Sequence, residues 1–363
     1  MKYPIYKSII FPNTKKYVLD CLDTTWISSR GSYIKKFEDS FANYLNVNFA
    51  TSVSNGTTAL HMCLCALGIG EGDEVIVPSF TYIASVNAIK YVGAEPVFID
   101  SDKSTWNIDV NLIDGLITKK TKAIMAVHLY GNPCNMTSLR KLCDERNLLL
   151  IEDVAEALGS TYEDKFLGTF GDVASFSFFG NKTITTGEGG MVVSNNKKII
   201  DKVASLKNQG ASEKKYWYEE VGYNYRMTNI CAAIGLSQVE QVESVLNRKK
   251  DIANLYHKEL KGYPLEFQQT ELKGVSSYWL ISILVKDKGI RDSLCTSLNN
   301  SGVETRPLFY PAHTMPMYSS SRIFPIAQNL SDRGLNLPSY PDLSNDDVIE
   351  ISKFIGEFFQ TKL

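Results

Sequence analysis

The sequence has no long apolar run and no excess of charge of either sign. The opening residues, MKYPIYKSIIFPNTKK, hold no stretch long enough for a signal peptide, and no later stretch of the 363 residues is long enough to span a membrane. We therefore expect a cytoplasmic protein without a membrane partner. The chain has 38 Lys and Arg against 40 Asp and Glu, a net charge of -2. Because no basic surplus exists to neutralise phosphates, we expect no nucleic-acid partner.

The sequence also has no CxxC pair, no internal repeat and no low-complexity tract. Its cysteines are odd in number and scattered, mostly within apolar patterns. Such a set favours buried free thiols in a reducing cytosol over disulfides or a zinc site, and we expect no metal. The seven are Cys21, Cys63, Cys65, Cys134, Cys143, Cys231 and Cys295.

Strand and helix signals alternate through the first half of the chain. The hydrophobic fraction of 44% and the charged fraction of 21% are typical of a soluble globular protein with an ample core. The alternation predicts an α/β fold with a mostly parallel sheet covered by helices on both faces. The expected strands are 50–53, 74–80, 96–100, 123–130, 148–155, 173–179 and 191–194, and the expected helices are 13–22, 37–45, 83–91, 109–117 and 139–146.

The chain is longer than one typical domain, and we expect two. A long helical pattern from about 228 to 260 is expected to join them. The boundary is placed so that 1–249 form a large domain and 250–363 a smaller one. In the second domain we expect strands at 278–285 and 303–307 and helices at 289–300 and 345–360.

Three polar residues follow the ends of expected strands: Tyr82, Asp153 and Lys182. Ligands of parallel sheets bind at the carboxyl ends of the strands, so these side chains are expected to converge there. A lysine just past an apolar strand is partly desolvated, which lowers its pKa and frees a nucleophilic amine for a Schiff base with an aldehyde such as pyridoxal 5'-phosphate (PLP). From the residues alone, Lys182 could instead be a surface lysine and Asp153 a helix cap.

The segment SVSNGTTALHMC combines a strand, a turn of small residues and a helix. Ser54 and Asn55 can cap this helix, leaving free backbone amides at Gly56, Thr57 and Thr58. These amides and the helix dipole suit a phosphate, although many helices begin in this way. The glycines at 68, 70 and 72 follow a helix and precede a strand, which is the reverse of a dinucleotide-binding loop, so we expect no NAD site.

Two loops rich in aromatic residues have two interpretations each. The loop 24–33 contains Trp26 and either lines a pocket or is a plain connection. The proline-marked loop PLFYPAHTMPMY contains Tyr310 and His313 and either covers a pocket or forms a docking surface.

The segments SNGTTAL, PSFTY, IEDVAEALGS, ASFSFFGNKTITTGEGG and GYNYRMTN occur in this order. Together they resemble the PLP-dependent nucleotide-sugar aminotransferases, in particular the branch that forms GDP-perosamine. The likeness runs from WISSRG to RGLNLPSYPDLS, nearly the whole chain. It implies a fold-type-I PLP-dependent transferase, with a mostly parallel sheet in the large domain and a smaller C-terminal α/β domain.

The resemblance also implies roles for residues around the cofactor. Lys182 matches the lysine that holds PLP covalently and then moves the proton, and Asp153 matches the carboxylate that faces the pyridinium nitrogen. Tyr82 falls where an aromatic ring stacks on the cofactor. Glu156 lies where the family places a polar group near the phenolic oxygen.

Further matches concern the phosphate and the substrate. Gly56, Thr57 and Ser177 match the groups that hold the phosphate. Asn224 matches an asparagine that reaches the phosphate from the neighbouring subunit, which implies a homodimer with shared active sites. Trp26, Tyr310 and His313 are the candidate substrate contacts.

The implied reaction moves the amino group of L-glutamate to C4 of a nucleotide-linked 4-keto-6-deoxyhexose. The favoured acceptor is GDP-4-keto-6-deoxymannose, giving GDP-perosamine for a surface polysaccharide such as O-antigen. A 4-keto sugar carried by dTDP or UDP remains an alternative. A PLP-dependent sugar dehydratase would carry histidine in place of Lys182. A catalytically silent cofactor-binding protein would have lost Lys182 or Asp153, and both are present.

Overall fold

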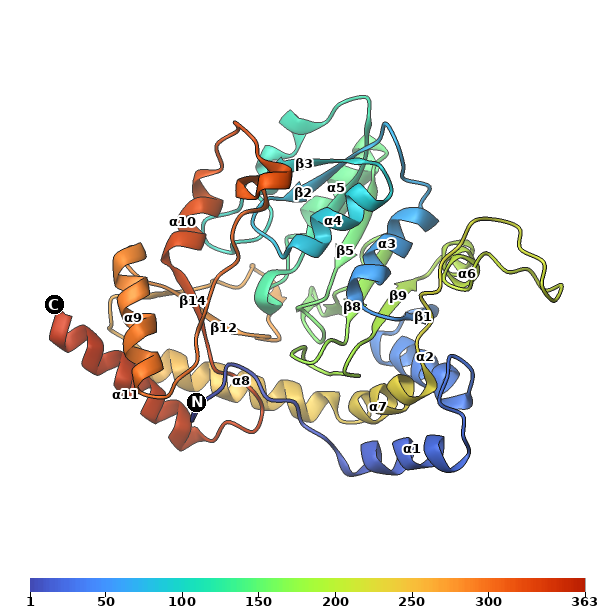
Figure 1. The fold of residues 1–363 in the computed structure, drawn as a ribbon. Helices are drawn as coiled ribbons and strands as arrows, with labels where there is room; N and C mark the ends of the chain where they lie inside the picture. Colours follow the sequence, from blue (N-terminus) through green and yellow to red (C-terminus); the bar gives the residue numbers. More distant parts are fainter. Residues whose placement is uncertain (363) are drawn as a thin grey trace.

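The computed structural model describes residues 1–362 and centres on a seven-stranded sheet (Figure 1). The strand order is β1-β9-β8-β5-β4-β2-β3, and β9 alone runs against the other six. The prediction of an α/β fold with a mostly parallel sheet is therefore confirmed. The strands are β1 (Phe49–Val53), β2 (Glu74–Pro78), β3 (Glu95–Ile99), β4 (Thr121–Val127), β5 (Leu149–Asp153), β8 (Val173–Ser177) and β9 (Gly190–Ser194).

Strand β5 lies at the middle of this sheet, between β8 and β4. Successive side chains of a strand point to opposite faces. Accordingly Ile151 belongs to one buried hydrophobic cluster and Leu150 to another on the opposite face. By the same alternation, Asp153 lies on the face of Ile151 and Glu152 lies on the face of Leu150. The two carboxylates at the end of β5 are therefore on opposite faces of the sheet.

Helices cover both faces. Helix α3 packs on β8 and β9, and α2 packs on α7 and β1. No helix within residues 1–362 is long and apolar enough to cross a membrane. The helices of this part are α1 (Pro12–Asp23), α2 (Ser32–Leu45), α3 (Gly56–Ala66), α4 (Ile83–Tyr91), α5 (Met136–Arg146), α6 (Lys197–Leu206) and α7 (Asn229–Val239).

The C-terminal part has its own four-stranded antiparallel sheet, in the order β10-β12-β14-β13, and its own core. The chain start joins this core, because Tyr3 is buried there and pairs with Val303. A small sheet of β6 (Thr161–Tyr162), β7 (Lys165–Phe166) and β11 (Gly274–Val275) links the two parts. The other elements are α8 (Val242–Glu259), β10 (Glu266–Phe267), β12 (Ile281–Leu284), α9 (Lys288–Asn300), β13 (Arg306–Pro307), α10 (Pro325–Arg333), β14 (Gly334–Leu337) and α11 (Asn345–Lys362).

Two sequence-based expectations were wrong. The helix expected at 109–117 is a pair of short 3-10 turns, Val110–Leu112 and Asp114–Leu116. Asp109 accepts a hydrogen bond from the backbone N–H of Asn111 at 3.0 Å, a local bond that competes with helix formation.

The single helix expected at 228–260 is broken at Glu240 and Gln241 into α7 and α8. Helix α7 packs on α1 and α2, whereas α8 packs on α11, so the chain changes packing partner at the break. The boundary placed between residues 249 and 250 falls inside α8, and the division into two domains stays a prediction.

Candidate active site

A cavity of about 500 Å³ opens where the large sheet meets the C-terminal part. Seven of the residues predicted for the site line it, and Trp279, Arg306 and Phe309 line it from the C-terminal part. The predicted convergence at the strand ends is thus present in one chain. The seven are Gly56, Thr57, Tyr82, Asp153, Glu156, Ser177 and Lys182.

Lys182 points into this cavity and is 13% exposed. Its Nζ atom lies 4.0 Å from the centre of the Trp279 ring and 3.8 Å from Oε1 of Glu156. Burial lowers the pKa of Lys182, against the opposing effect of the Glu156 and Asp153 carboxylates. The interpretation as a surface lysine is therefore wrong, and burial favours the neutral, nucleophilic form of the amine.

Glu156 is also buried, with 4% of its surface exposed. Its Oε2 atom accepts a hydrogen bond from the backbone N–H of Tyr130 at 2.9 Å. Burial raises the pKa of Glu156 to about 7, although the nearby Lys182 acts in the opposite direction. Glu156 can therefore change protonation near neutral pH, next to the amine.

Asp153 ends strand β5 and is 4% exposed. Oδ2 accepts a hydrogen bond from the Ser85 hydroxyl at 2.8 Å, and Oδ1 accepts one from the backbone N–H of Ala155 at 3.1 Å. Asp153 caps no helix, because the residues after it form turns. Burial raises the pKa of Asp153, and its two hydrogen bonds and Lys182 oppose that rise. A buried carboxylate aimed into the cavity fits a protonated ring nitrogen.

The start of helix α3 forms the other end of the cavity. Asn55 and Thr58 form a reciprocal capping box, so the predicted cap at Asn55 is present. The N–H groups of Gly56 and Thr57, in the first turn, have no partner within the helix. A Cβ on Gly56 would lie 2.6 Å from the Ser177 Cβ, so glycine is required for this close approach. Two amides and a hydroxyl thus form a cradle that fits a phosphate.

Aromatic rings line the wall between these groups. Tyr82 is 56% exposed, and its ring centre lies 5.8 Å from that of Phe309. Tyr130 is buried and stacks between Trp279 and Phe309 at interplanar angles of 5° and 22°. The exposed face of Tyr82 can stack on a planar ring held between the cradle and Asp153.

Four predicted residues do not line the cavity of their own chain: Asn224, Trp26, Tyr310 and His313. Asn224 is exposed, and its Oδ1 atom accepts hydrogen bonds from Arg226 at 3.0 and 3.3 Å. It does not cap α7, because Thr228 does so. Asn224 is therefore free to face another molecule.

The other three lie in the two aromatic loops. Trp26 is 55% exposed between α1 and α2, and Tyr310 is 59% exposed. His313 accepts or donates a 2.6 Å hydrogen bond with Ser79 and lies against Phe324. Their assignment to the substrate stays a prediction.

Sequence reasoning missed three residues that shape the site. Ser85 holds Asp153, and Trp279 covers Lys182 while its Nε1 donates to the Asn181 carbonyl at 2.7 Å. Tyr130 adopts a left-handed backbone conformation, with φ of 56°. Ser85 lies one helical turn beyond Tyr82, a signal that could have been used. Trp279 is nearly 100 residues from Lys182, and no local pattern indicated their contact.

The chain is similar to a group of known proteins. The model of the DegT/DnrJ/EryC1/StrS aminotransferase family matches residues 9–355. The chain is 56% identical to GDP-perosamine synthase of Escherichia coli O157:H7 over 366 residues, covering 100% of both chains. It is 52% identical to GDP-perosamine synthase of Vibrio cholerae, covering 98% of this chain and 99% of the relative. The PLP form of a putative sugar aminotransferase, Spr1654 from Streptococcus pneumoniae, superposes with a TM-score of 0.95 at 28% identity, covering 100% of both chains.

Proposed function

Because the chain belongs to the DegT/DnrJ/EryC1/StrS aminotransferase family, we propose that it forms GDP-perosamine from GDP-4-keto-6-deoxymannose. The chain is a PLP-dependent aminotransferase. The observation that carries the choice of sugar is the 56% identity to GDP-perosamine synthase over the full length of both chains. Relatives from three organisms carry that name, at 46% to 56% identity. The product serves the synthesis of a surface polysaccharide such as O-antigen.

The amino donor in this proposal is L-glutamate, which leaves as 2-oxoglutarate. When bound, PLP supplies an electron sink for the electron pair that stays on the α-carbon of the donor after its proton is removed. Lys182 would hold the cofactor covalently and, when free, its amine would take the proton from the α-carbon of the donor. In the second half of the reaction the same amine would deliver a proton to C4 of the sugar.

The neighbouring residues hold the cofactor in place for these proton transfers. Asp153 would favour the protonated ring nitrogen, which keeps the ring electron-poor. Gly56, Thr57 and Ser177 would hold the phosphate, and Tyr82 would stack on the ring. Glu156, whose Oε1 atom lies 3.8 Å from Nζ of Lys182, stabilises the lysine when it is protonated.

The homodimer with shared active sites belongs to the same proposal, as does a cytoplasmic location. In support, Asn224 is exposed and lies outside the cavity of its own chain. A competing dehydratase reaction requires the loss of the lysine that completes amino transfer, and Lys182 is present in the cavity.

A substrate panel tests the proposal. The purified protein with PLP and L-glutamate is incubated with 4-keto-6-deoxyhexoses carried by GDP, dTDP or UDP, and the products are identified by mass. We expect an aminated product from GDP-4-keto-6-deoxymannose and at most traces from the others. Lys182→Ala serves as the inactive control. Efficient amination of a dTDP or UDP sugar instead would assign the chain to another 4-aminotransferase.

A further inference from the structure

Directly beside Asp153, on the opposite face of the sheet, lies a second carboxylate that the proposed reaction does not use. Glu152 is fully buried, with 0% of its side chain exposed. It makes no contact with a lysine or an arginine among the described residues; its one ion-pair neighbour is His128. A buried carboxylate without a cation is costly unless hydrogen bonds satisfy it.

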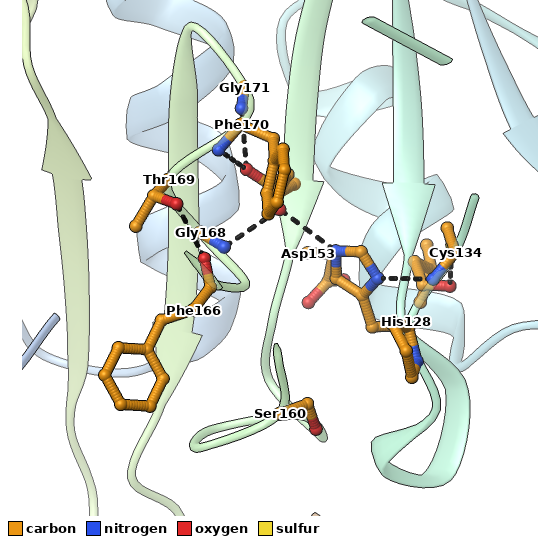
Figure 2. Close-up of polar contacts among 12 residues, drawn as sticks. His128, Cys134, Asp153, Ser160, Phe166, Gly168, Thr169, Phe170 and Gly171 are labelled. Carbon is orange, nitrogen blue, oxygen red and sulfur yellow. Dashed lines mark hydrogen bonds and ion pairs between the residues drawn. The ribbon is translucent and has the colours of Figure 1, made fainter. Parts of the chain in front are cut away.

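Four hydrogen bonds satisfy Glu152. Its Oε1 atom accepts from the backbone N–H groups of Phe170 at 2.8 Å and Gly171 at 2.6 Å. Its Oε2 atom accepts from the backbone N–H of Gly168 at 2.8 Å and interacts with Nε2 of His128 at 3.2 Å. Figure 2 shows the four donor residues, Gly168, Phe170, Gly171 and His128, with dashed lines for their hydrogen bonds.

The ring of His128 is held from both sides. Its Nδ1 atom accepts a hydrogen bond from the backbone N–H of Cys134 at 3.1 Å, so the proton of the ring is on Nε2 and points to Glu152 (Figure 2). The backbone N–H of His128 also donates to the carbonyl of Asp153 at 3.2 Å. The histidine therefore connects the end of β4 to the end of β5.

The donors come from the two segments that flank Asp153 and lead to other site residues. His128 follows β4 and precedes Tyr130, whose N–H holds Glu156. The loop 168–171 leads into β8, which carries Ser177. One carboxylate thus joins the three neighbouring strands β4, β5 and β8 on the side away from the cavity.

We propose that Glu152, together with His128, is a positioning residue that holds Asp153, Ser177 and Glu156 in the arrangement that binds the cofactor. The inference rests on the proposed function, because it concerns the same site. Neither residue touches the cavity, so neither is a catalytic residue. The alternative is that Glu152 only stabilises the fold, without an effect on the site.

Glu152→Gln distinguishes the two. The variant keeps the shape of the side chain, but its NH2 group faces an N–H donor whichever way the amide is oriented. Asp172→Asn is the matched control, because Asp172 accepts a hydrogen bond from the N–H of Leu150, at 2.8 Å, at the other end of β5. For each variant, the thermal midpoint of the protein without cofactor is measured first. PLP is then titrated at a temperature well below the lowest of these midpoints. The absorption of the bound cofactor is measured as a function of pH.

We expect Glu152→Gln to bind PLP roughly 10- to 100-fold more weakly, as when a group that orients a ligating side chain is lost, and to shift the pH at which the bound cofactor changes absorption. Asp172→Asn should lower the midpoint without changing either quantity. If Glu152→Gln does not fold, His128→Leu, which retains the three backbone donors, should show a smaller shift in the same direction. PLP affinity and spectrum equal to wild type in a folded Glu152→Gln or His128→Leu protein would overturn the inference. A wild-type protein that fails to bind PLP would instead overturn the proposed function.

Discussion

The Nζ atom of Lys182 lies 3.8 Å from Oε1 of Glu156, and both side chains are almost completely buried. Burial acts on the two groups in opposite directions, lowering the pKa of the lysine and raising that of the glutamate to about 7. Burial therefore opposes the charged form of each group, while the attraction between the two charges supports it.

This balance predicts how stability depends on pH. The pKa of Glu156 is raised from its usual 4.5 to about 7 in the folded chain. Between pH 4.5 and 7 the folded state therefore holds more protons than the unfolded state. Stability of the protein without cofactor should fall as pH rises through this window. Glu156→Gln removes this contribution, so between pH 4.5 and pH 8 its stability relative to wild type should rise by up to about 3 kcal/mol. Urea unfolding at both pH values measures the difference.

The amide of Glu156→Gln can still accept the hydrogen bond from Tyr130, so the variant isolates the ionisation. The exposed Glu71→Gln is the control and should change stability little at either pH. A gain for Glu156→Gln that is the same at pH 5 and pH 8 would show that the carboxyl does not titrate in this window.

A second prediction concerns the charge of Asp153. In Asp153→Asn the amide oxygen can keep the bond from Ala155 while the NH2 group donates to Ser85, so the geometry is retained and only the charge is lost. We expect PLP to stay bound but proton removal from glutamate to slow by roughly two to three orders of magnitude, equivalent to about 3–4 kcal/mol. Rapid mixing with glutamate, followed by absorbance, measures this step. Ser85→Ala keeps the charge and should slow it far less; a near-normal rate in Asp153→Asn would mean that Asp153 faces something other than the ring nitrogen.

A third prediction tests the shared active site. Asn224→Ala should bind PLP roughly 10- to 150-fold more weakly, because a charge-assisted bond to a phosphate contributes about 1.5–3 kcal/mol. Thr228, not Asn224, caps α7, so stability should change little. Equilibrium titration with PLP and thermal unfolding measure the two quantities.

Subunit mixing gives the stricter form of this test. We expect Lys182→Ala and Asn224→Asp each to be inactive, the second because it places a like charge beside the phosphate. A mixed dimer contains one site in which both residues are wild type, so activity should partly return. No recovery, with subunit exchange confirmed, would place Asn224 in the site of its own chain or outside any site.

The residues that could be predicted are those that follow strand ends. Tyr82, Asp153 and Lys182 converge because parallel strands deliver their carboxyl ends to one edge, and that rule needs only the local pattern. Gly56 and Thr57 followed from a helix start. The family resemblance added Ser177 and Glu156, which periodicity alone did not single out.

The parts that could not be predicted depend on contacts distant in the chain. Trp279 reaches Lys182 from the C-terminal part, and the break between α7 and α8 reflects a change of packing partner. In the sequence, Glu152 is a polar residue in an apolar strand, and no local pattern distinguishes it. Its role appears only when the loop 168–171 and His128 are placed around it (Figure 2).

The central claim is that Lys182 is the residue that holds PLP, and the structure provides two competitors for a sharp test. Lys249 is buried and Lys207 is half-buried, and burial lowers the pKa of each, that of Lys249 to about 7. Neither lines the cavity that contains Asp153. A lowered pKa alone would therefore allow any of the three lysines to bind PLP. Only Lys182 lies in the cavity with Asp153.

The deciding measurement is borohydride reduction of the PLP-loaded protein, followed by digestion and mass analysis of the modified peptides. We predict one modified lysine per chain, at Lys182, and loss of the label in Lys182→Ala. A label at Lys207, Lys249 or any other lysine would contradict the account.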